Sequence, residues 1–76
     1  MKITSEALWR RVRDINDRPA LNLLRQIWLR SREHVHPDSI LGRIYQDCQD
    51  VYDLVYAFRA LEREKHWDIP RLIDDM

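Results

Sequence analysis

The chain has little of what disordered segments, sheets and disulfide-stapled domains need. Its 76 residues include one glycine, three prolines and one cysteine. Scarce glycine and proline argue against disorder and against repeats, and the Leu-, Arg-, Glu- and Gln-rich remainder favours helix over strand. The length allows one domain with a modest core. The sequence therefore predicts a single small all-α domain spanning residues 1–76.

The single cysteine and the absence of long apolar runs exclude further classes of protein. The lone thiol of Cys48 cannot form an internal disulfide, which favours a reducing compartment and a cytoplasmic protein. No apolar run approaches the roughly 20 residues of a membrane-spanning helix, and nothing resembles a signal peptide. We therefore expect a cytoplasmic protein without a membrane partner.

Apolar spacing and capping residues together predict three helices. They are expected near residues 5–16, 18–34 and 39–66, followed by a short turn near residues 70–74. Asp17 and Pro19 suit the start of the second helix, and Asp38 or Ser39 can cap the third. We expect a three-helix bundle in which the second and third helices form an antiparallel hairpin and the third is long.

The stretch from Ser39 to His66 is more apolar around its circumference than two short helices can cover. Its seam, at spacings of three and four, contains Leu41, Ile44, Cys48, Val51, Val55 and Phe58. Tyrosines form a second stripe beside the seam, so the apolar arc spans roughly 220°, about twice the usual stripe. Either the tyrosines cover the edge of the internal core, or this flank binds another protein.

The second possibility provides the functional prediction. Tyrosine supplies a large contact area at low entropic cost and tolerates water before binding. The predicted partner-binding residues are Tyr45, Tyr52, Tyr56 and Leu41. We expect a non-enzymatic adaptor, inhibitor or regulator, of a kind typical of phage or mobile elements, whose partner is a second copy of the chain or a protein target.

Charge is balanced overall but divided between the two parts of the chain. Residues 1–32 carry a net +5 and residues 33–76 a net −5. An alternative function is therefore nucleic-acid binding, with Asn16–Pro19 as the turn of a helix-turn-helix. The candidate residues are Arg10, Arg11, Arg13, Arg18, Arg25 and Arg32. The last three recur every seven residues, and they can instead pair with Asp47, Asp50 and Asp53.

Catalytic and metal-binding patterns are weak. No Ser/His/Asp or Cys/His arrangement is indicated, and the spacing of His34, His36 and His66 matches no zinc module. We expect no enzyme activity, no metal and no cofactor.

One tripeptide allows a remote alternative. His36-Pro37-Asp38 resembles the signature of J-domain co-chaperones, which carry it in the loop of a helical hairpin and stimulate an Hsp70 partner. The turn before it differs from that family, since Ser31, Arg32 and Glu33 replace apolar residues. The family's tyrosine-rich first helix and the lysine-rich start of its loop are also missing.

Overall fold

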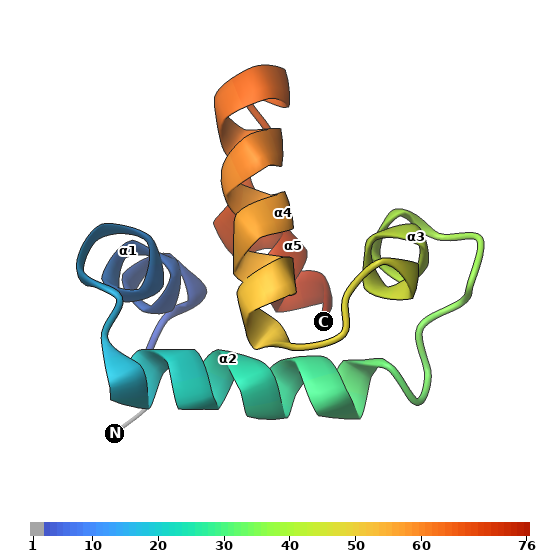
Figure 1. Cartoon of the computed structure of the whole chain (residues 1–76), viewed down its shortest axis with the longest axis horizontal. Coiled ribbons are helices and arrows are strands. Elements are labelled where there is room, and N and C mark those ends of the chain that lie inside the picture. Colours follow the sequence, from blue (N-terminus) through green and yellow to red (C-terminus); the bar gives the residue numbers. More distant parts are fainter. Residues whose placement is uncertain (1–2) are drawn as a thin grey trace.

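The structure, a computed structural model that describes residues 3–76, confirms the all-helical class. Every regular element in this range is a helix (Figure 1). The helices are α1 (Ser5–Ile15), α2 (Arg18–Ser31), α3 (Ile40–Gln46), α4 (Val51–Lys65) and α5 (Ile69–Asp75). The short turn expected near residues 70–74 is thus a helix of two turns.

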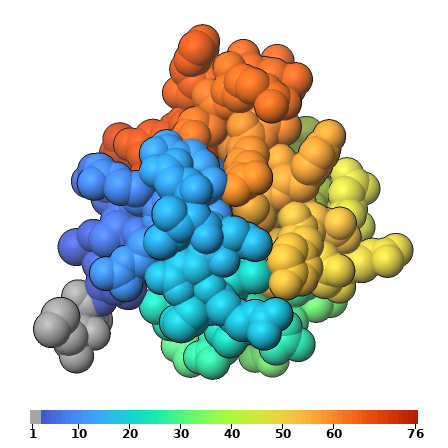
Figure 2. All heavy atoms as spheres, turned by 60° about the vertical axis from the view of Figure 1, so that its left-hand side comes forward, coloured from blue at the N-terminus to red at the C-terminus, as the bar shows by residue number. Residues whose placement is uncertain are grey.

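The five helices are arranged around α4. Helix α2 lies along one side of the molecule, and α4 stands across it with α1 and α3 on opposite flanks (Figure 1). Helix α5 lies behind α4 in this view and packs against α1. Figure 2 shows α1 lying directly beside α4 on this flank.

The predicted long third helix is instead two helices, which is the main correction to the expected fold. The chain leaves the helical path after Gln46, and α4 begins at Val51. The Asp50 carboxylate accepts a hydrogen bond from the Asp53 amide at 3.0 Å, and the Asp53 carboxylate accepts one from the Gln49 amide at 2.9 Å. Such caps contribute about 1 kcal/mol each and satisfy amides at the start of a helix.

The break also removes the expected antiparallel hairpin and three-helix bundle. Helix α3 packs against α4, and α4 in turn crosses α2. The apolar period continues through residues 39–66 because α3 and α4 each turn a stripe toward the same core. Periodicity alone therefore could not distinguish one long helix from two short ones.

The other helix ends follow local signals in the sequence. The Thr4 hydroxyl accepts a hydrogen bond from the Ala7 amide at 3.1 Å, and the Ser39 hydroxyl accepts one from the Gly42 amide at 3.0 Å. Asn16 and His66 end α1 and α4 in the left-handed conformation, with φ of 51° and 57°. Helix α2 ends at Ser31, three residues earlier than predicted.

The core lies where α4 meets α1 and α2. Leu54 and Phe58 of α4 are fully buried, and the Phe58 ring meets the Trp9 ring of α1 edge to face with centroids 5.9 Å apart. The Arg59 guanidinium donates to the Arg13 carbonyl at 2.5 Å and to the Val12 carbonyl at 3.4 Å. These bonds satisfy carbonyls that the end of α1 leaves without helical partners.

Gly42 is required by the loop that precedes α3. A Cβ atom at this position would overlap the His36 carbonyl oxygen and lie 2.9 Å from backbone atoms of Pro37. The glycine therefore allows close approach of residues 36–37 to α3.

We expect Gly42→Ala to destabilise the protein, although alanine is the better helix former by about 1 kcal/mol. The overlap involves backbone atoms, which cannot move aside as a flexible side chain can, and overpacking of this kind costs about 1–3 kcal/mol. Urea unfolding followed by circular dichroism measures the change. A variant as stable as the parent would show that the loop does not approach α3 so closely.

Candidate docking groove between α3 and α4

The predicted partner-binding residues fall into two groups. Tyr52 and Tyr56 of α4 are exposed, at 58% and 76%, whereas Tyr45 and Leu41 of α3 are buried. Tyr45 and Leu41 are therefore core residues, and their assignment to a docking surface is corrected. The reason is the break at residues 47–50, which turns α3 so that its apolar side faces the core.

Tyr45 is tied into that core by a polar contact. Its hydroxyl lies 2.9 Å from the Ser31 hydroxyl, and both residues are buried. Burial raises the pKa of Tyr45, an effect that the Ser31 hydrogen bond partly offsets. The contact links the end of α2 to α3, since a buried hydroxyl needs a partner.

An apolar groove runs between α3 and α4. It has a volume of about 480 Å³, with Ile44 and Cys48 on the α3 side and Tyr56, Ala57, Ala60 and Leu61 on α4. Arg43, Asp47 and Asp53 also line it. Tyr56 lies at the edge of the groove. It is one of the lining residues, but its side chain is mostly exposed to solvent.

The two alanines explain why the groove is hollow. Ala57 and Ala60 are half-buried and too small to fill the space between α3 and α4. The sequence places both alanines on the water-facing side of the helix, so it does not predict that they line a hollow. The sequence feature that could have indicated the hollow is this pair of small residues, three positions apart, between the apolar seam and the charged side of the helix.

Cys48 is the lining residue whose side chain could act as a nucleophile most readily. Its surroundings, however, keep the thiol neutral. Burial raises the pKa of its thiol, and the carboxylates of Asp53, Asp47 and Asp50 raise it further. The thiol donates a hydrogen bond to the Ile44 carbonyl at 3.2 Å. A neutral thiol of this kind is a packing group rather than a reactive one.

A larger hollow lies on the other flank of α4, and several of its polar groups already bind one another. It has a volume of about 1020 Å³ between α1, α4 and α5. Glu62 accepts from the Trp9 indole at 2.7 Å and pairs with Arg13 at 3.2 Å, and the Ser5 hydroxyl bonds to Asp74. These bonds tie the helices together, so we assign this hollow a structural role.

The predicted nucleic-acid-binding arginines also divide by their partners. Arg10 pairs with Glu6 at 2.8 Å, and Arg13 contacts Asp14 at 2.7 Å besides Glu62. Arg11, Arg18, Arg25 and Arg32 are exposed. Within residues 3–76 no ion pair joins the last three to Asp47, Asp50 or Asp53, so the expected internal pairing is not formed.

The histidines do not come together. Among the described residues, no three metal-ligating side chains are grouped as a metal site requires. His36 Nδ1 accepts a hydrogen bond from the Asp38 amide at 3.0 Å, which is a local turn contact. The His36-Pro37-Asp38 loop connects α2 to the short helix α3. In a J-domain the same tripeptide joins the two helices of a long hairpin, so the arrangement here is different.

Comparison with protein-family models, with curated proteins and with solved structures finds no match for this chain. In the part of the chain that the structure describes, none of the helices has the length and apolar character to cross a membrane.

Removing the Tyr45 hydroxyl should weaken the fold. Tyr45→Phe leaves the Ser31 hydroxyl without its buried partner, so we expect a loss of about 1–2 kcal/mol in the free energy of unfolding. Tyr52→Phe is the matched control, because the exposed hydroxyl keeps water as a partner and should change stability by less than about 0.5 kcal/mol. Equal effects of the two changes in urea unfolding would contradict a buried Tyr45.

The Cys48 thiol should react slowly and at unusually high pH. Because its folded pKa is raised, the neutral thiol stabilises the fold at low pH, and this contribution is lost as pH rises through the folded pKa. The pH profile of iodoacetamide alkylation should therefore have a midpoint above the ordinary value of about 8.5. The same protein in urea is the control. Coincident folded and unfolded profiles would show that the thiol is not shielded.

Proposed function

We propose that this protein is a non-enzymatic interaction module that docks another protein through the groove between α3 and α4. The observation that carries the proposal is Tyr56, a large aromatic side chain that is 76% exposed beside an apolar hollow floored by alanine. Aromatic anchors beside unfilled pockets are typical of the centres of protein interfaces. Tyr52, one turn earlier and also exposed, extends the same surface.

The geometry favours a second copy of the chain as the partner. A protruding tyrosine next to a hollow makes the surface complementary to itself, and two-fold symmetry uses each feature twice. If the two α4 helices lie antiparallel, Tyr56 of each copy enters the hollow above Ala57 and Ala60 of the other. Pairing would also enlarge a core that is modest for a chain of this length.

The expected role is that of a small adaptor, inhibitor or regulator. The protonated, hydrogen-bonded thiol of Cys48 supports a binding rather than a catalytic role for the groove. A single cysteine fits a reducing, cytoplasmic setting.

Self-association can be tested by analytical ultracentrifugation across the micromolar range. We expect a monomer–dimer equilibrium in the parent and a monomer in Ala60→Arg, because the long charged side chain fills the hollow that the partner's Tyr56 would occupy. Ile40→Ser is the matched control. It changes a 54% exposed apolar residue at the start of α3, outside the groove, and should leave the equilibrium unchanged.

A parent protein that stays monomeric at high micromolar concentration would exclude the second copy as the partner. Affinity capture with the parent and with Ala60→Arg then tests a different protein partner on the same surface. Identical captured proteins with both baits would exclude the groove itself. Circular dichroism of each variant checks that helical content is retained.

A further inference from the structure

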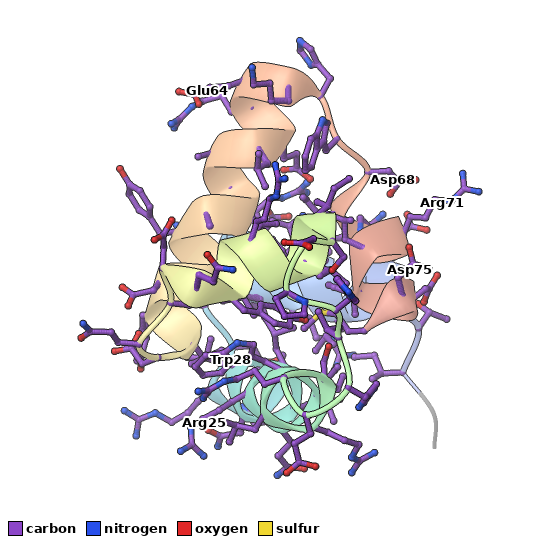
Figure 3. All side chains as sticks on the ribbon, turned by 90° about the vertical axis from the view of Figure 1, so that its right-hand side faces the viewer. Arg25, Trp28, Glu64, Asp68, Arg71 and Asp75 are labelled. Carbon is purple, nitrogen blue, oxygen red and sulfur yellow. The ribbon has the colours of Figure 1, made fainter. Side chains whose placement is uncertain are left out.

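Helix α2 presents one side of the molecule on its own. Helices α1, α3 and α4 all lie on its inner side, and none of the described helices covers its outer side (Figure 1). In Figure 3, Trp28 lies on the inner side of α2 and Arg25 on the outer side, where it extends away from the other helices.

The charge of this outer side has one sign. Helix α2 contains Arg18, Arg25 and Arg30 and no acidic residue, and Arg32 follows directly as its C-cap. All four arginines are exposed, and none forms an ion pair within residues 3–76. By contrast, Arg10 and Arg13 of α1 are paired, and Arg59 is bound to carbonyls. Arg11, Arg43, Arg63 and Arg71 are exposed as well, but they are spread over four helices, whereas the α2 arginines share one face. The Arg32 guanidinium stacks over the Trp28 ring at 5.1 Å from its centroid, a contact with the face of the guanidinium that leaves its in-plane N–H groups for an external anion.

Their positions on the helix form two edges. At about 100° per residue, Arg18, Arg25 and Arg32 follow one edge of the exposed face and Arg30 lies on the other. The exposed amides of Asn22 and Gln26 lie between these edges, one turn apart. The acidic residues nearest in sequence, Asp17 and Glu33, flank the helix at its two ends rather than on its face.

This arrangement matches the dimensions of duplex DNA. A helix about 10–12 Å in diameter fits the major groove, which is about 12 Å wide. Guanidinium groups on both edges of the helix can reach phosphates of both strands, and arginine suits phosphate because its planar fork binds two oxygens. Amides in the centre of the face are the side chains that contact adenine edges in the major groove.

We infer that α2 is a DNA-binding helix whose outer face enters the major groove of a duplex. The four arginines hold the phosphate backbones, and Asn22 and Gln26 face the bases. The surface belongs to a different helix from the α3–α4 groove, so the two sites can be occupied together and tested separately.

Fluorescence anisotropy of a labelled mixed-sequence duplex of about 20 base pairs tests the inference. Each phosphate contact contributes about −0.9 to the slope of log affinity against log salt, so four contacts predict a slope of about −3.6. Measurements from about 25 to 200 mM NaCl determine this slope. The triple variant Arg18→Gln, Arg25→Gln, Arg30→Gln should reduce its magnitude by about 2.7 and weaken binding at low salt more than about tenfold.

A matched control separates a local contact from a general loss of charge. Arg11→Gln, Arg63→Gln, Arg71→Gln removes three exposed arginines from α1, α4 and α5, none of which lines the α3–α4 groove, and should keep most of the affinity and slope. Equal losses in the two triple variants, or no binding by the parent at about 25 mM salt, would overturn the inference. Binding to anionic phospholipid vesicles that equals DNA binding would do the same, because it would show a general anion surface. Circular dichroism verifies that both variants fold.

Discussion

The packing of α4 against α1 and α2 is the contact on which the other parts of the molecule depend. Leu54 and Phe58 are fully buried there, and burial of each such side chain contributes about 1.5–3 kcal/mol. Arg59 adds bonds to the open end of α1, and Glu62 binds the Trp9 indole. Helix α3 packs against the opposite flank of α4, and the α3–α4 groove lies where α3 does not fill the space beside α4.

The capped turn at residues 47–50 determines what that flank presents. It ends α3 early and directs Tyr45 into the core, where Ser31 pairs with its hydroxyl. Tyr52 and Tyr56 lie beyond the turn and stay in solvent. A stripe that is continuous in sequence is thereby divided into a structural part and an exposed part. Tyr56 in the exposed part borders the groove, which stays open because Ala57 and Ala60 are too small to fill it.

The two proposed binding surfaces use different helices and different chemistry. The α3–α4 groove is apolar and bordered by an exposed tyrosine, which suits a protein partner. The outer face of α2 is basic and open, which suits phosphate. A dimer formed through the first surface would carry two copies of the second, and paired recognition helices are a common way for small proteins to bind DNA.

The sequence by itself determined the helical class and, to within a residue, the starts of α1, α2 and α3. These features depend on local composition, on capping residues such as Thr4 and Ser39, and on one helix period at a time. Only the tertiary structure decided that residues 39–66 form two helices, because the same period continues through the turn and both helices face one core. It also decided that Tyr45 and Leu41 are buried and that Ala57 and Ala60 floor a groove, since a hollow depends on the shape of the neighbouring helix and not on the residues of one helix alone.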